Sequence, residues 1–198
     1  MRERWYGDPR DLIKWATLVH AAGGAGIRTI AQIGFVAGTD GRPTISSGSD
    51  ECSIQDAVWR HFRNLQDIKR LSSETGLLIE VFDRPFVHRS RRQYVSEALR
   101  CVSGIRGRKL VFLDPDTGLA IAARGPRHVS GPEVAQFWAA LRPHDQLVLY
   151  QHAWRKSDWV NQARQRFGNA ISFTADVRVY RSTSAGRDVV LLAARRKA

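Results

Sequence analysis

One stretch decides the fold of this sequence: Val111-Phe112-Leu113-Asp114-Pro115-Asp116-Thr117-Gly118-Leu119. Three apolar residues run directly into two carboxylates, a pattern typical of a buried strand that ends in a functional loop. Pro115 has no N–H and restricts the residue before it to extended backbone, so it fixes the direction in which Asp114 leaves the strand. We therefore expect a buried strand at the centre of an α/β domain, with a site where that strand ends.

Strands and helices alternate on both sides of this stretch. Apolar periodicity and capping signals predict the boundaries. A helix is expected to begin at Asp8-Pro9 and to stop at Gly23, and a polar loop should cover residues 38–50. The predicted strands are 28–36, 77–82 (apolar enough to be covered on both faces), 109–113 and 146–150, and the predicted helices are 53–73, 91–102, 130–141 and 157–167, the last ended by Gly168.

This alternation indicates βαβ units, and hence a mostly parallel sheet with helices on both faces. Residues 177–180 and 189–193 should close the chain as an antiparallel hairpin. A length of 198 residues favours one domain, spanning residues 1–198. We expect an α/β fold of the Rossmann-like three-layer sandwich type.

Ligands of such sheets bind beyond the carboxyl ends of the strands. Three polar strand exits should therefore meet at one edge, namely 34–40, 114–118 and 150–152. The two carboxylates of Asp114 and Asp116 can hold a metal, take a proton or bind a ligand amine. The alternative is a turn in which both side chains accept backbone N–H groups.

The charge balance indicates a polyanionic partner. Lys and Arg number 31 against 19 Asp and Glu, a formal net charge of +12, so RNA or DNA is the expected partner. The alternative is that the cations are dispersed without a ligand. Candidate contacts are Arg127 with Arg124 and His128, the helix-start group Arg89, Arg91 and Arg92, and the segment that carries His152, Trp154, Arg155 and Lys156.

Several function classes lack support in the sequence. No apolar run is long enough to cross a membrane and no secretory segment is evident, so the default expectation is a cytoplasmic protein. Cys52 and Cys101 are expected to be reduced, and no Cys/His cluster has zinc-ligand spacing. We predict no metal ligand for the favoured function.

A strand that ends in Asp-Pro-x, followed by helix, strand, helix and a terminal antiparallel hairpin, resembles the second half of class I S-adenosylmethionine-dependent methyltransferases. More narrowly, the chain is similar to bacterial large-subunit rRNA adenine-N6 methyltransferases, whose Ala-Asp-Val-Leu-Lys helix matches Asp11-Leu12-Ile13-Lys14 after Tyr6. The chain has about one βα unit fewer before the Asp-Pro strand than that order requires.

The resemblance implies a nucleic-acid-modifying enzyme that uses S-adenosylmethionine. Asp114 and Pro115, with Asp116 beside them, would bind the amine to be methylated. The cofactor would contact Gly34 and Gly38, and Glu80 near the end of the second strand (or its neighbour Asp83) would bind a ribose hydroxyl. The expected substrate contacts are Lys14, Arg127, His152 and Arg155.

Two alternatives stay open. Asp114-x-Asp116-Thr117 after an apolar strand is also similar to the nucleophile motif of haloacid-dehalogenase-type phosphatases. That similarity implies a magnesium-dependent phosphatase or phosphotransferase in which Asp114 forms an aspartyl-phosphate and Asp116 acts as acid and base. The second alternative is a non-catalytic basic domain that only binds nucleic acid.

Overall fold

The computed structural model describes residues 9–35, 44–47, 50–53, 65–120, 125, 127–154, 157–172, 175–182 and 186–198, with backbone alone for residue 9 and for the two segments between 44 and 53. Several residues singled out from the sequence lie outside the described residues: Tyr6, Gly38, Arg124, Arg155 and Lys156.

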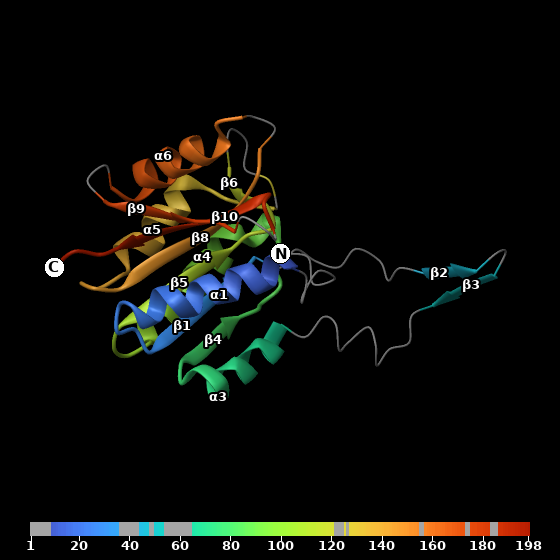
Figure 1. Ribbon diagram of the computed structural model, residues 1–198, viewed down its shortest axis with the longest axis horizontal. Helices are drawn as coiled ribbons and strands as arrows, with labels where there is room; N and C mark the ends of the chain where they lie inside the picture. The colour runs from blue at the N-terminus through green and yellow to red at the C-terminus, as the bar shows by residue number, and fades with distance from the viewer. Residues whose placement is uncertain are drawn as a thin grey trace.

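A six-stranded sheet forms the centre of the molecule, with the order β4-β1-β5-β8-β10-β9 (Figure 1). β4, β1, β5 and β8 run parallel to one another, whereas β10 is antiparallel to both β8 and β9. This confirms the mostly parallel sheet with a terminal antiparallel hairpin. The strands are β1 (Thr29–Gly34), β4 (Leu78–Phe82), β5 (Lys109–Asp114), β8 (Gln146–His152), β9 (Val177–Tyr180) and β10 (Val189–Arg195).

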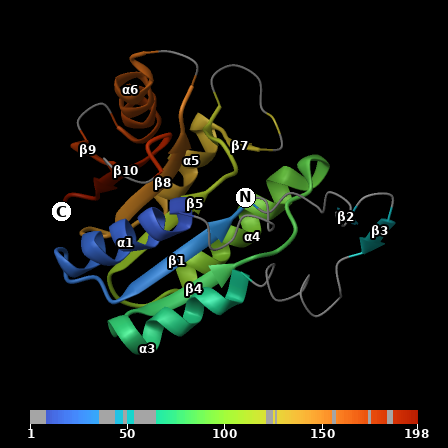
Figure 2. The same cartoon turned by 45° about the vertical axis from the view of Figure 1, so that its right-hand side comes forward.

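Helices cover both faces of this sheet, which gives the three-layer Rossmann-like sandwich that the sequence predicts (Figures 1 and 2). On one face lie α1 (Pro9–Gly23), the 3₁₀ helix η2 (Leu65–Arg70) and α3 (Leu71–Thr75). On the other lie α4 (Arg91–Gly104), α5 (Gly131–Ala139) and α6 (Trp159–Ile171), with the short 3₁₀ helix η3 (His88–Ser90) before α4.

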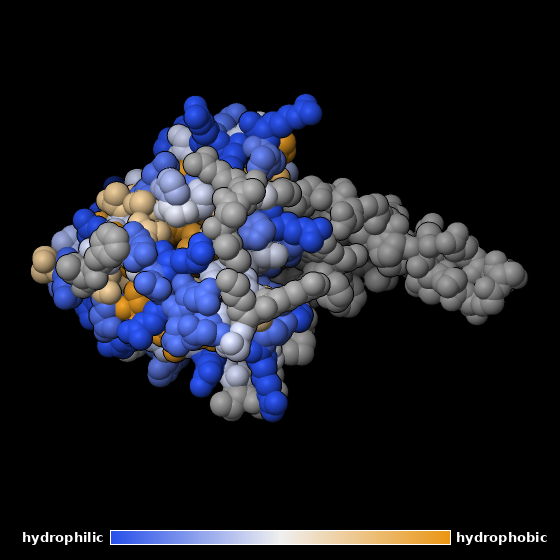
Figure 3. Space-filling model, turned by 90° about the horizontal axis from the view of Figure 1, so that it is seen from above, coloured by the Kyte–Doolittle hydropathy of each residue, from blue (hydrophilic) through white to orange (hydrophobic). Residues whose placement is uncertain are grey.

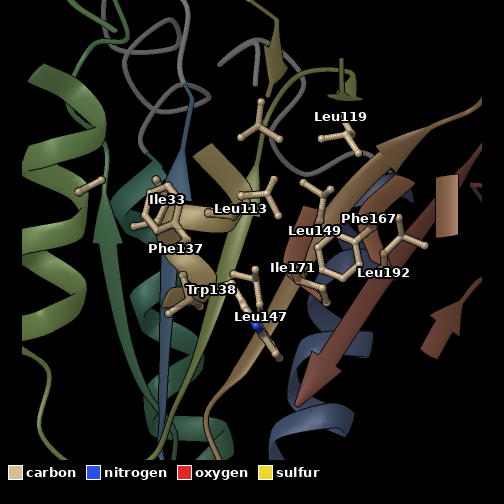
Figure 4. Close-up of a cluster of buried hydrophobic side chains, with 14 of the residues drawn as sticks. Ile33, Leu113, Leu119, Phe137, Trp138, Leu147, Leu149, Phe167, Ile171 and Leu192 are labelled. Atoms are coloured by element: carbon tan, nitrogen blue, oxygen red, sulfur yellow. The ribbon is translucent and has the colours of Figure 1, made fainter. Parts of the chain in front are cut away.

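The central strand β5 supplies both hydrophobic cores because its side chains alternate between the two faces. Phe112 packs on the α1 side, and Leu113 packs on the side of α5 and α6. Figure 4 shows the second core, in which Leu113 lies among side chains that include Phe137 of α5 and Phe167 of α6. All six residues of β5 are buried, so the opening stretch is the central strand predicted from its composition.

The order β5, α5, β8, α6 and the β9–β10 hairpin is the order expected from the methyltransferase-like second half. Two strands of the main sheet, β1 and β4, precede β5. A two-stranded parallel pair, β6 (Gly118–Leu119) with β7 (His128–Val129), follows β5 directly. The loop after Asp114 is therefore anchored by its own short sheet.

Three sequence predictions about elements were wrong. Residues 38–50 do not form a loop throughout, since β2 (Thr44–Ser47) pairs with β3 (Asp50–Ser53) as an antiparallel hairpin, so the predicted 53–73 helix cannot begin at Ser53. β-branched residues in that segment favour a strand. The described end of the predicted 53–73 helix consists of the 3₁₀ helix η2 followed by the α-helix α3. Residues 54–64 lie outside the described residues.

The other two wrong predictions are the coverage of one strand and the end of one helix. β4 is an edge strand rather than one covered on both faces, and Leu78 is 54% exposed. α6 continues through Gly168 to Ile171. A glycine inside a helix costs only about 1 kcal/mol relative to alanine, and burial of Ile171 offsets that cost.

Hydrophilic side chains dominate the described surface in Figure 3, with small apolar areas between them. In the described part of the chain, no helix is both long enough and apolar enough to span a membrane.

Candidate functional site

The carboxyl edge of the sheet brings together the three strand exits that the sequence singled out. Gly34 ends β1 in register with Asp114 at the end of β5. Gln151, near the end of β8, contacts the loop after Asp114, because its Nε2 donates to the Thr117 carbonyl at 3.1 Å. Parallel strands end at the same edge, and this shared direction produces the convergence.

Asp114 itself is enclosed. Its side chain is fully buried and points to the α1 face, where Lys14 Nζ lies 3.1 Å from Asp114 Oδ1. Gln32 Nε2 donates to Asp114 Oδ2 at 2.9 Å. A buried carboxylate persists only when it is paired and hydrogen-bonded in this way. In this conformation the Asp114 carboxylate faces Lys14 and Gln32, so binding of a target amine by Asp114, through its carboxylate or its backbone carbonyl, stays a prediction.

Lys14 is committed to the same cluster. Its ammonium also donates to Asp11 Oδ1 at 3.0 Å and lies 4.4 Å from the centre of the Tyr150 ring. Burial alone would lower the pKa of Lys14, but the Asp114 and Asp11 carboxylates outweigh it and the pKa is raised. The side chain is 6% exposed and paired with two carboxylates, so substrate contact by Lys14 stays a prediction that this conformation does not display. We call Asp11, Lys14, Gln32 and Asp114 the buried cluster.

Gln151 positions the loop after Asp114. Its Oε1 accepts from the Leu119 backbone N–H at 2.9 Å, and its Nε2 also donates to the His152 carbonyl at 2.8 Å. Gly118 has φ +105°, and a Cβ there would lie 2.5 Å from Gln151 Oε1. The loop therefore needs glycine at this position. Gln151 is a functional residue that was not predicted, and the signal for it in the sequence is a polar residue next to the end of an apolar strand.

Asp116 is the more accessible carboxylate of the pair. Its side chain is 18% exposed, and Arg127 Nε lies 3.6 Å from Asp116 Oδ2 with the Arg127 side chain 51% exposed. Thr117 fixes the backbone beside it, since both its N–H (3.0 Å) and its Oγ1 (2.9 Å) donate to the Arg127 carbonyl. Asp116 and Arg127 thus stand together at the rim, as the sequence predicts, whereas Pro115 is buried behind them.

His152 belongs to a second polar group at this edge. His152 Nε2 lies 3.1 Å from Asp188 Oδ2, and Arg10 contacts the same carboxylate at 2.6 Å. The hydrogen bond from Arg10 lowers the pKa of Asp188, so this side chain is ionised at neutral pH. All three side chains are 37–40% exposed. The sequence indicated His152 but not its partners Arg10 and Asp188. We call Arg10, His152 and Asp188 the exposed cluster.

Glu80 does not belong to the cofactor edge. It pairs with Ala31 in the middle of β4, and its charge helps to raise the pKa of Cys101 near the far end of α4. The acidic residue just beyond β4 is Asp83, which accepts from Gln66 Nε2 at 2.7 Å. Tyr94 donates its hydroxyl to the Gly34 carbonyl at 2.9 Å. Burial and the Asp83 charge raise the pKa of Tyr94. Asp83 thus lies closer than Glu80 to the end of the sheet where Gly34 and Asp114 end their strands.

Arg91 is structural and is not a free phosphate contact. Its guanidinium is buried against Glu133 of α5 and donates to the Gly125 carbonyl at 3.2 Å, so it fixes the loop between β6 and α5. Burial and the Arg91 charge lower the pKa of His128, so at neutral pH that imidazole adds no charge to the predicted basic rim. Arg89 and Arg92 are exposed at the start of α4.

Two oxygens of the buried cluster, Gln32 Oε1 and Asp114 Oδ1, are buried and accept no hydrogen bond within the described residues. Gln32 is 1% exposed and Asp114 is fully buried, so neither oxygen faces solvent or a ligand in this conformation. In the described residues, no group of three or more His, Cys, Asp or Glu side chains is placed to hold a metal ion. The enclosed Asp114 is also not exposed for attack on a phosphoester, so the phosphatase alternative has no support in this geometry.

No protein-family model matches the sequence, and no curated protein matches it. Among solved structures, a DUF574 family protein from Streptomyces avermitilis is 12% identical, with a TM-score of 0.42 over 95% of this chain and 82% of that chain. A candidate methyltransferase from Thermobifida fusca is 11% identical, with a TM-score of 0.41 over the same shares. Neither similarity assigns an activity to this chain.

Proposed function

We propose that this protein is an S-adenosylmethionine-dependent methyltransferase that acts on an amine of RNA or DNA. One observation carries the proposal. Gly34 adjoins Asp114-Pro115-Asp116 at the carboxyl edge of a parallel sheet that ends in an antiparallel hairpin. That arrangement is the one implied by the resemblance, and it places glycine and carboxylate side by side where ligands of such sheets bind.

The acceptors at this edge suit the cofactor. S-adenosylmethionine carries an ammonium group and ribose hydroxyls, and it supplies an electrophilic methyl group when bound. The Asp83 carboxylate suits the hydroxyls in place of Glu80. Tyr94 holds the Gly34 carbonyl that ends β1 and so fixes the floor of this site.

The target amine needs acceptors for its hydrogens. In our proposal, the Asp116 carboxylate and the Pro115 carbonyl bind that amine, while Asp114 fixes the strand end from which both project. In such a transfer the sulfur–methyl bond of the cofactor would break as the nitrogen–methyl bond forms, leaving the neutral thioether S-adenosylhomocysteine and a nitrogen that must lose one proton. His152, held by Asp188 at the same edge, is the titratable group suited to take that proton, directly or through water.

The basic surface suits a nucleic-acid substrate. Arg127 stands half-exposed beside Asp116, and Arg89 and Arg92 are exposed near the Tyr94 end of α4. With a net charge of +12, binding to RNA and DNA should weaken steeply as salt rises. Salt dependence alone fits a non-catalytic nucleic-acid-binding domain equally well, so the experiment must measure the cofactor.

Titration calorimetry with S-adenosylmethionine, alone and with RNA or DNA, tests the proposal. We expect saturable binding, and transfer of labelled methyl groups to nucleic acid. Asp116→Asn should lower transfer by about 100-fold while leaving cofactor affinity within about threefold. Glu74→Gln, an equal charge change on exposed α3, should match the wild type. No heat of binding under any of these conditions would refute the proposal.

The non-catalytic alternative predicts a different result. In that case RNA and DNA bind with strong salt dependence, no methyl transfer occurs, and Asp116→Asn binds as the wild type does.

A further inference from the structure

A second site lies at the opposite, amino edge of the sheet. A cavity of about 530 Å³ opens between the end of α1, strands β9 and β10 and the C-terminal residues. In Figure 1 this edge faces left, where the C-terminus lies. The volume falls within the range of about 300–1,000 Å³ typical of small-ligand sites. Its lining includes the side chains of His20, His144, Arg178, Tyr180, Arg195 and Lys197.

The cavity is strongly cationic. Its lining holds four Lys or Arg side chains and two His, against the single acidic side chain of Asp176. Arg178, Arg195 and Lys197 make no ion pair with a carboxylate within the described residues. Cations gathered without an acidic partner repel one another, and an anion bound between them relieves that repulsion.

The rim of the cavity is held in place by the backbone. The His144 N–H donates to the Arg196 carbonyl at 2.8 Å, and the Arg196 N–H donates to the Asp145 carbonyl at 2.8 Å. His144 adopts φ +72°, an uncommon conformation for a residue other than glycine. Arg196 is fixed over the Trp138 ring at 5.3 Å. These contacts tie the backbone of the C-terminal segment, which carries Arg195 and Lys197, to the turn before β8.

The end of α1 does not oppose an anion strongly. The carboxyl end of a helix carries partial negative charge when its carbonyls are free. Here the His20, Ala22 and Gly23 carbonyls accept from backbone N–H groups of residues 24–27. Tyr180 adds an aromatic face, and its ring packs edge-on against His20 at 6.3 Å between centroids. An aromatic face beside cations suits a nucleobase joined to a phosphate.

We infer that this amino-edge cavity binds a phosphate ester of about nucleotide size. Arg178 and Arg195 present planar forks that match phosphate oxygens, Lys197 adds a point charge, and Tyr180 offers a surface for the base. The phosphate can belong to a free nucleotide or to a nucleic-acid strand. The inference does not depend on the proposed methyl transfer, because no residue of the cavity belongs to the carboxyl edge.

Binding of adenosine monophosphate, inorganic phosphate and a single-stranded oligonucleotide of about 10 nucleotides to the full chain tests this inference. The variant Arg178→Glu/Lys197→Glu should weaken binding by about tenfold or more. The matched control is Arg100→Glu/Arg164→Glu, which makes the same charge change at exposed positions of α4 and α6 and should stay within about twofold. Circular dichroism melting establishes that both variants fold.

The three probes distinguish the sources of phosphate. Variant-specific loss of the mononucleotide and of phosphate indicates a free nucleotide, and the same loss with the oligonucleotide alone indicates a strand. Either result supports the cavity. Amide chemical shifts should change at His144 and Arg178 when the bound probe is added. Equal weakening in both variants, or no saturable binding of any probe, would overturn the inference.

Discussion

Two polar clusters lie at the same edge of the sheet, and both join α1 to distant strands. The buried cluster connects Lys14 of α1 to Asp114 of β5, with both side chains 6% exposed or less. The exposed cluster connects Arg10 of α1 to Asp188 and His152, each 37–40% exposed. The two clusters contain similar ion pairs, but only the buried one has lost its contact with water. Breaking a buried pair therefore costs much more free energy than breaking an exposed one.

Burial makes the first cluster essential to the architecture and unsuited to exchange ligands. Removing either charged side chain leaves the other buried, with neither its partner nor water to stabilise its charge. The second cluster remains in contact with solvent, so its members can lose a partner at small cost. His152 is therefore accessible to solvent and to a substrate, whereas Asp114 is enclosed. This difference is why our proposal gives Asp114 a structural role and places the chemistry on Asp116 and His152.

The largest predicted effect separates the clusters directly. Lys14→Met leaves Asp114 buried without its cation, so we expect a loss of about 3–5 kcal/mol in the free energy of unfolding. Arg10→Met removes the equivalent cation from the exposed cluster and should cost less than about 1 kcal/mol. Urea unfolding followed by circular dichroism measures both. Equal losses would remove the distinction between the clusters.

A second prediction tests how rigidly the loop between the clusters is held. Gly118→Ala places a Cβ 2.5 Å from Gln151 Oε1 at φ +105°, so we expect a loss of about 2–3 kcal/mol. Gly107→Ala is the matched control, because φ is also positive (+77°) but nothing lies within 4 Å of the added atom. It should cost only about 1 kcal/mol. A similar cost at both positions would show that the Gln151 contact is loose.

A third prediction uses pH to probe the buried side. Lys14 and Tyr150 have pKa values raised above their ordinary values of 10.5 and 10.0. Desolvation raises the pKa of Tyr150, while for Lys14 nearby carboxylates outweigh desolvation. The native state therefore holds more protons than the unfolded state above pH 10. The stability from these groups is complete below pH 10 and is lost as pH rises through the folded pKa values.

Each such group contributes a slope of at most about 1.4 kcal/mol per pH unit. Urea midpoints measured between pH 8 and pH 12 should therefore fall above pH 10, and the fall should be shallower in Lys14→Met. A stability that is flat across this range would contradict the buried pairing.

The smallest predicted change in stability concerns the exposed cluster. His152→Asn should alter the free energy of unfolding by less than about 1 kcal/mol. Under the proposed function it should lower methyl transfer by about 10- to 100-fold, with a changed pH profile. Unaltered transfer would remove His152 from the proposed proton path.

Much of the fold could be predicted because it depends on local pattern. The apolar run before Asp114 indicated the central strand, and the position of Pro115 indicated where it ends. Alternating elements then placed Gly34, Asp114 and Gln151 at one edge, which the register confirms. The cap of α5 could also be predicted, since the Ser130 N–H donates to Glu133 at 2.8 Å.

The pairings could not be predicted, because they join residues far apart in the chain. Nothing local indicates that Lys14 meets Asp114, or that Arg10 meets Asp188 across 178 positions. Glu80 was placed at the wrong point because a strand's register on its neighbour sets how near a residue lies to the edge. The Asp114-Pro115-Asp116 motif therefore predicted an accessible catalytic carboxylate at Asp114, whereas in the fold that carboxylate is buried.

Amide hydrogen exchange of the protein with and without S-adenosylmethionine tests the central claim most directly, because it locates the cofactor. We predict slower exchange in the segments that contain Gly34, Asp114–Leu119 and Asp83 when the cofactor is added, and unchanged exchange around His144 and Arg195 at the amino edge. Protection confined to the amino edge, or no protection anywhere, would contradict the assignment of methyl transfer to the carboxyl edge.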